Sequence, residues 1–217
     1  MKNILLQTVI ILLFNVAGFA QKDDKAKEIL DKSSAAFSAA NAMSANFTIN
    51  IKDTSKKLNV SYEGKIDIKG TKFHIDIPDH EIWFNGKTQW VLQKDWNEVS
   101  ITEPDEQETQ TLNPGVIFSI YKKGCKHKYL GEKSDAQKRK IHEIELIPQN
   151  KENGMAKIIL QINVGDWMPV MFHIYFTNEI ENIVHINKYK TKMSLSDNLF
   201  VFDAKKHPEV EINDLRN

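Results

Sequence analysis

The side chains that could do chemistry are seven histidines, one cysteine and a pair of glutamates. The histidines stand at positions 74, 80, 127, 142, 173, 185 and 207. His173 and His185 could face each other on neighbouring strands and bind a metal ion, but no carboxylate or cysteine is placed to complete such a site. We therefore interpret the histidines as surface or hydrogen-bonded strand residues, and we expect neither a metal nor a cofactor.

The lone Cys125 lies between Lys122-Lys123 and Lys126, cations that would lower its pKa and allow a reactive thiolate. Nothing in the sequence marks a partner base, so an incidental buried or half-buried cysteine is the favoured interpretation. Glu143 and Glu145 fall on one face of an expected strand and could form an acid/base pair, although a solvated face explains them equally well.

Known catalytic motifs are missing from the sequence. It holds no G-x-S-x-G elbow, phosphate-binding loop, dinucleotide fingerprint or H-E-x-x-H zinc helix, so we expect no enzyme and no catalytic residue. The 217 residues include 29 basic and 29 acidic side chains, and this zero net charge argues against a nucleic-acid partner. Eleven Phe, five Tyr and four Trp argue against disorder.

The first twenty residues have the pattern of a secretory signal peptide. Lys2 is followed by a mostly apolar run over 4–16, and the small residues Gly18 and Ala20 occupy positions −3 and −1 of a cleavage site. The alternative is a membrane anchor, but the run is interrupted by polar residues and is shorter than the roughly 20 apolar residues that a span needs. We expect residues 1–20 to be removed and the product to be exported, soluble and not lipidated, since no cysteine follows the site.

The elements that must position these side chains are one helix followed by strands. Small and apolar residues recur at helical spacing over 25–40, namely Ala26, Ile29, Leu30, Ser33, Ala36, Phe37 and Ala40. From residue 47 the period changes to two, and Asn85-Gly86 favours a tight hairpin. Strands are predicted at 47–51, 60–68, 73–77, around 83, 90–92, 99–101, 126–131, 140–147, 157–164, 170–176, 183–190 and 199–202. We therefore predict a mainly β (α+β) fold with about ten or eleven strands, in a single domain over 21–217.

A short second helix is predicted in the middle of the chain. Asn113 caps it, Pro114 occupies its first position, and the cationic pair Lys122-Lys123 with Gly124 ends it. The acidic stretch 103–111 before it reads as an exposed connection, which could also dock a basic partner.

The succession of these elements resembles the LolA-like periplasmic carriers of outer-membrane lipoproteins. The resemblance covers nearly the whole chain after residue 20, in order, and each motif alone is weak. The matching segments are Met43 to Thr48, Lys69 to Phe73, Asn85 to Trp90, Asn97 to Val99, Asn113-Pro114, Phe200 to Asp203 and Val210 to Arg216.

The resemblance implies an incomplete antiparallel β-barrel whose concave apolar face is covered by the N-terminal helix and the short central helix, acting as a lid. It further implies a monomer that takes acylated lipoproteins or related lipids from an inner-membrane release complex to an outer-membrane acceptor. Many such carriers place an Arg just before the strand that begins here at Phe73, where it holds the lid shut. This sequence has Gly70-Thr71-Lys72 instead, and a lysine cannot reproduce the forked bonding of a guanidinium.

Two other functions stay open: an exported β-rich interaction or scaffold module of the cell envelope without a lipid ligand, and an exported hydrolase.

Strand parity and the helical face select the residues expected to line an acyl-chain cavity. The expected lining is Ile29, Leu30, Phe37, Phe47, Ile49, Ile51, Phe73, Ile75, Ile77, Trp83, Trp90, Leu92, Ile117 and Tyr121.

Overall fold

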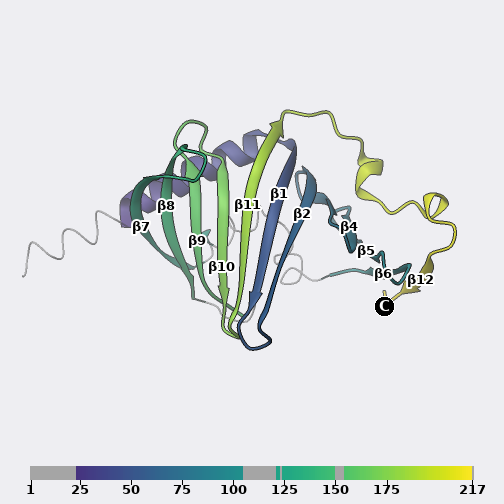
Figure 1. Ribbon diagram of the computed structural model, residues 1–217. Coiled ribbons are helices and arrows are strands. Elements are labelled where there is room, and N and C mark those ends of the chain that lie inside the picture. The colour runs from purple at the N-terminus through teal and green to yellow at the C-terminus, as the bar shows by residue number, and fades with distance from the viewer. Residues whose placement is uncertain (1–22, 105–120, 123, 150–153, 217) are drawn as a thin grey trace, which may run out of the picture.

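The computed structural model describes residues 23–104, 121–122, 124–149 and 154–216, and Figure 1 shows the ribbon. These residues build one twelve-stranded sheet in the order β12-β6-β5-β4-β3-β2-β1-β11-β10-β9-β8-β7. Neighbouring strands are antiparallel except for β12 and β6, which are parallel. The strands are β1 Ala42–Asp53, β2 Leu58–Lys69, β3 Lys72–Asp76, β4 His80–Phe84, β5 Gln89–Gln93, β6 Glu98–Thr102, β7 Cys125–Ser134, β8 Lys140–Pro148, β9 Met155–Asn163, β10 Pro169–Phe176, β11 Ile180–Thr191 and β12 Glu211–Asp214.

The N-terminal helix (residues 23–39) crosses the end of the sheet behind β7 to β11 in Figure 1. Its predicted face is the one that packs, since Ala26, Ile29 and Leu30 are fully buried against the sheet. On the solvent side Glu28 and Asp31 pair with lysines three or four residues away. Such exposed pairs are screened by water and contribute little, so burial of the apolar face holds the helix in place.

The sheet has one apolar face because the strand registers align the apolar positions. A row runs through direct cross-strand partners on five adjacent strands, in the order Ile144, Leu160, Phe172, Val184 and Ile49. Side chains alternate between the two faces of a strand, so cross-strand partners lie on the same face. We call this the concave face; it is the face that the N-terminal helix covers.

The short strands β3 to β6 form a wing of the sheet (Figure 1). This wing carries a second apolar cluster on the face opposite to the concave face. The chain after β11 runs along this wing and buries Phe200 and Phe202. The ring of Phe202 meets Trp83 edge-on at a centroid distance of 5.3 Å. The C-terminal segment therefore shields the side of the wing that faces away from the N-terminal helix.

The predicted turn at Asn85-Gly86 is confirmed. Gly86 has a φ of +100°, a conformation in which a side chain would be strained. The Asn85 side chain closes the turn, because its Oδ1 accepts hydrogen bonds from the backbone N–H groups of Lys87 and Thr88.

Two details at the C-terminus differ from the sequence-based prediction. The strand predicted over 199–202 is wrong, because Asp197–Phe200 form a short 3₁₀ helix capped by the Ser196 hydroxyl. A strand that period-two reasoning did not predict, β12, adds to β6 in parallel with all four side chains exposed. An exposed strand carries no alternation to read, since neither of its faces is buried.

Other predictions fall on residues that are not described. The signal peptide over 1–20 lies outside the described residues, and so does the predicted central helix except for the helical residues 121–122. Among the described residues, no helix has the length and apolar content that crossing a membrane requires.

Candidate functional site

Nine of the fourteen predicted lining residues gather in the apolar cluster between the N-terminal helix and the concave face. Five are buried, namely Ile29, Leu30, Phe47, Phe73 and Tyr121. Four are half-buried against the same cluster, namely Phe37, Ile49, Ile75 and Ile77. Ile51 is half-buried one step further along the same face of β1, whereas Ile117 lies outside the described residues.

Some apolar side chains of the concave face are only partly buried. Ile82 on β4, Ile174 and Phe176 on β10 and Val184 on β11 are half-buried, like Ile49 at the centre of the sheet. Sequence reasoning missed Ile82 because it assigned the next residue, Trp83, to this face. It missed the other three because the expected lining comes from strands earlier in the chain, although β10 and β11 show the same alternation. A partly exposed apolar face continuous with a core is a surface suited to an apolar ligand.

Trp83, Trp90 and Leu92 do not belong to this face, and their assignment to the same lining is corrected. Trp83 on β4 is the cross-strand partner of His74 and of Trp90, so it lies on the face of the sheet opposite to Phe73. With Leu92 these tryptophans form the second cluster, under Phe202. Parity could not be carried across the turn between β3 and β4, where the chain reverses and the count restarts.

Polar contacts tie the segment at 121–122 to the N-terminal helix. The Tyr121 hydroxyl donates to Asp31 Oδ1 at 2.6 Å, and Lys122 Nζ donates to Ser34 Oγ at 3.2 Å. Lys27 and then Tyr121 lower the pKa of the Asp31 carboxyl, so it stays an anion and a strong acceptor. On the same helix the fully buried Ser33 hydroxyl has no hydrogen-bond partner within the described residues.

His142 lies on the concave face, where only 6% of its surface is exposed. Its Nδ1 is 3.0 Å from the Tyr129 hydroxyl, and its ring stacks on Trp167 at 5.5 Å. Burial lowers the pKa of His142 below its usual 6.5, because a charged imidazolium is poorly solvated there. The histidine is thus a neutral, hydrogen-bonded part of the apolar face.

The buried His142 makes stability depend on pH. As the pH falls below 6.5, the unfolded chain takes up a proton that the folded protein resists, so the free energy of unfolding should decrease. The variant His142→Gln should show a shallower decrease between pH 6.5 and 5, measured by urea unfolding, with pH 8 as the internal reference. An unchanged slope would contradict this account.

Cys125 is buried, with 8% of its surface exposed. The expected effect of the neighbouring lysines is corrected, because burial raises the pKa of the thiol to about 11. The interpretation as an incidental buried cysteine is confirmed.

The thiol of Cys125 should therefore react slowly in the folded protein. With a water-soluble disulfide reagent at pH 8, we expect labelling at least about tenfold slower than in 6 M guanidinium, because both thiolate fraction and access are low. Fast labelling of the native protein, followed by absorbance, would show that the thiol is open to solvent.

The other candidate groups make structural contacts. Glu143 accepts hydrogen bonds from Lys133 and Gln161, and although burial alone would raise its pKa, these partners lower it. His173 Nε2 lies 2.8 Å from Glu181 Oε2. Because its partners keep the Glu143 carboxylate ionised, Glu143 is poorly suited to serve as the acid of an acid/base pair.

Lys69 at the end of β2 and Lys72 at the start of β3 make no described interaction with the N-terminal helix. Lys69 and Lys72 both pair with Asp197, at 2.9 and 3.2 Å, and Lys69 also donates to the Leu195 carbonyl. They hold the C-terminal segment instead. The position at which the resemblance places a lid-closing arginine thus serves a different contact in this chain.

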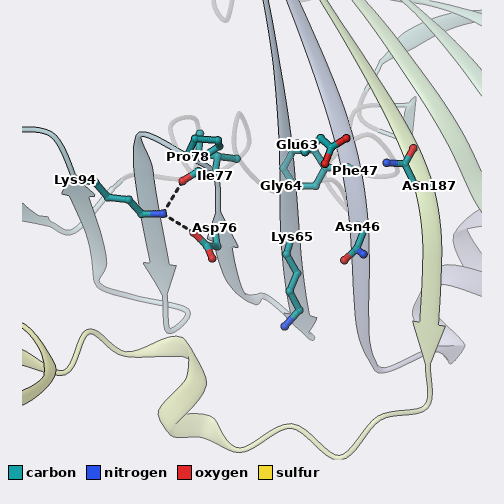
Figure 2. A pocket seen from close by; sticks show the side chains of 10 residues that line it. All are labelled: Asn46, Phe47, Glu63, Gly64, Lys65, Asp76, Ile77, Pro78, Lys94 and Asn187. Carbon is teal, nitrogen blue, oxygen red and sulfur yellow. Dashed lines mark hydrogen bonds and ion pairs between the residues drawn. The ribbon is translucent and has the colours of Figure 1, made fainter.

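A cleft of about 490 Å³ opens where β2 and β3 part, next to the concave face. Figure 2 shows β2 on one side and the end of β3 with Lys94 on the other. Lys94 Nζ donates to Asp76 Oδ1 at 2.6 Å and to the Ile77 carbonyl at 2.7 Å. The lining is Asn46, Phe47, Glu63, Gly64, Lys65, Asp76, Ile77, Pro78, Lys94 and Asn187.

Solved structures with similar folds come from several bacteria. An uncharacterized conserved protein from Thermus thermophilus is 13% identical, with 89% of this chain and 99% of that chain covered and a TM-score of 0.58. LprF from Mycobacterium bovis is 11% identical, covering 80% and 96%, with a TM-score of 0.49. A putative outer membrane lipoprotein-sorting protein domain from Vibrio parahaemolyticus is 11% identical, covering 82% and 97%, with a TM-score of 0.46. The Thermus likeness shows a shared fold.

No curated protein matches the sequence. The sequence profile of one family, described as outer membrane lipoprotein carrier protein LolA, matches residues 16–175, which include the N-terminal helix and β1 to β10. The open antiparallel sheet with a helix on its concave face agrees with this match, and the expected resemblance is confirmed. The chain belongs to the family of LolA outer-membrane lipoprotein carrier proteins.

Proposed function

We propose that this protein is a periplasmic carrier that binds the acyl chains of lipoproteins or related lipids and takes them toward the outer membrane, without catalysis. The observation that carries the proposal is the partly buried apolar area of the concave face, around Ile49, Ile174 and Val184. An apolar face that a protein leaves partly open is commonly a binding surface. The family match supports the same class of ligand.

The energetics of the cargo explain why such a face is needed. Each buried CH₂ contributes about 0.8 kcal/mol, so a sixteen-carbon chain gains on the order of 12 kcal/mol by leaving water. A carrier must offer apolar surface that matches the acyl chain in size, and it must also be able to release the acyl chain again. Because contact residues such as Ala26 and Ser33 have small side chains, the helix can be displaced from the sheet at low cost when a ligand enters.

The polar end of the ligand also finds a candidate donor. Ser33 Oγ is buried on the side of the helix that packs against the concave face, without a partner among the described residues. The ester or amide carbonyl of an acylated molecule is an acceptor for such a hydroxyl. In this proposal an inner-membrane release complex supplies the cargo and an outer-membrane acceptor with higher affinity takes it.

Extraction of the purified protein with organic solvent, followed by mass spectrometry, tests the proposal. We expect acyl species in stoichiometric amount, and saturable binding of a fluorescent fatty acid once they are removed. If no acyl species is found and the probe does not bind, the carrier function fails and the envelope-scaffold alternative is favoured.

Depletion in cells is a second test. If the carrier function is correct, lipoproteins destined for the outer membrane accumulate in the inner membrane, as fractionation would show. Normal sorting during depletion would contradict transport of lipoproteins and leave free lipids as the cargo.

A further inference from the structure

The edge of β2 is unpaired along half of its length. β2 begins at Leu58, but its pairing with β3 begins only at Lys65, opposite Asp76. On that side no described strand pairs with residues 58–64. Backbone N–H and C=O groups on such an edge are a template for another extended chain.

The opposite wall of the cleft cannot extend this ladder. After Asp76 the chain turns, and the N–H of Ile77 donates a hydrogen bond to the His80 carbonyl, so it is not free for another strand. Pro78 has no N–H to donate, and Lys94 fixes the turn through Asp76 and the Ile77 carbonyl (Figure 2). The gap is therefore held open by the chain itself.

The cleft is lined by residues from both faces of the sheet. Its lining includes Phe47 and Gly64, which share the concave face, and Asn46 and Lys65, which share the opposite face. A Cβ on Gly64 would lie 2.6 Å from the Phe47 ring and 2.7 Å from the Ile77 side chain. Glycine is thus required for the apolar floor to reach the edge of β2.

The charges around the cleft are balanced. Glu63 and Asp76 are acidic, Lys65 and Lys94 are basic, and both lysines already pair with carboxylates at 2.7 and 2.6 Å. An anionic head group would find no uncommitted cation among these residues. The groups left for a ligand at this edge are the backbone N–H and C=O groups of β2 that no described strand pairs, and these match another peptide backbone.

We propose that this cleft binds an extended segment of the cargo polypeptide, the residues that follow its acylated end, as a strand added to the free edge of β2. The inference rests on the proposed function, since the acyl chains lie on the adjoining concave face. It assigns the protein part of the cargo a place, and it identifies a lipoprotein rather than a free lipid as the preferred ligand.

Proximity tests the site. In a Cys125→Ala background, a fluorophore is attached at Glu63→Cys beside the cleft or, as a matched control, at Glu132→Cys, an exposed position on β7. A synthetic diacylated peptide of about ten uncharged residues carries a nitroxide on its fourth residue, close enough to quench a dye at the cleft if the peptide adds to β2. We expect strong quenching at position 63 and little at 132. Equal quenching at both positions overturns the proposal.

Affinity tests the mode of binding with the wild-type protein. We expect the diacylated peptide to bind about tenfold more tightly than diacylglycerol, and N-methylation of alternate peptide nitrogens to remove the difference, because added strands bind through main-chain hydrogen bonds. If both ligands bind equally, or phosphatidylglycerol binds more tightly than the peptide, the cleft proposal fails while the carrier function stands. If neither acylated ligand binds, the carrier function itself fails.

Discussion

The variant Ile49→Asp should lose at least about tenfold in affinity for a fluorescent fatty acid, because a carboxylate against a bound acyl chain is desolvated without a partner. Ile49 lies at the centre of the concave face, between Val184 on β11 and Tyr62 on β2, and is half-buried. In the free protein its carboxylate can still reach water, so the fold should persist. Titration of the probe, with circular dichroism as the check on folding, measures the effect.

The neighbouring residue supplies the control. Asn50→Asp introduces the same charge on the same strand, but its side chain lies on the opposite face, so probe affinity should stay within twofold of wild type. Val184→Thr, an isosteric change on the concave face, should weaken binding by an intermediate factor. Equal effects of the two aspartates would place the ligand elsewhere than on the concave face.

The variant Phe73→Ala should lower the free energy of unfolding by about 3–5 kcal/mol, the range for aromatic truncation in a packed core. Phe73 is 1% exposed, and its ring packs against Phe84 with centroids 5.2 Å apart. It pairs across strands with Ile68 and Phe84, so removing its ring leaves a cavity walled by rigid sheet. Urea unfolding at pH 7.5 gives the value.

A second aromatic on the same face distinguishes core from binding surface. Phe176 at the end of β10 is only half-buried, so Phe176→Ala should cost less stability and weaken fatty-acid binding more than Phe73→Ala does. The reverse order would mean that Phe73 contacts the ligand and that Phe176 is part of the core.

Local patterns determined most of the elements. The spacing of Ala26, Ile29 and Leu30 predicted the N-terminal helix and the face that it buries. Alternation predicted the strands wherever one face is buried, as around Phe47 and Ile49. Where burial is lost, as in β12, or where an aromatic sits in a short 3₁₀ helix, as does Phe200, the pattern misled or was silent.

The residues that make up the candidate site were harder to predict from the sequence than the helix and strands. Residues within one strand were assigned to a common face correctly, as for Phe73 and Ile75 on β3. The assignment of Trp83 failed because parity is lost at each turn, and only the pairing of Trp83 with His74 shows which face it occupies. For Cys125 the favoured interpretation, an incidental buried cysteine, is confirmed, and burial raises the pKa of its thiol to about 11 despite the neighbouring lysines.

The sequence by itself determined a β-rich chain with one amphipathic helix, no recognisable catalytic motif and motifs that resemble a family of lipoprotein carriers. These properties depend on local periodicity and residue type, which can be read from the sequence without knowing which strands pair. The tertiary structure alone decided that β2 outruns β3, that Gly64 brings Phe47 to the resulting cleft and that Lys94 holds its far wall. Strand pairing between distant segments sets these features, and no local pattern records which edge is left unpaired.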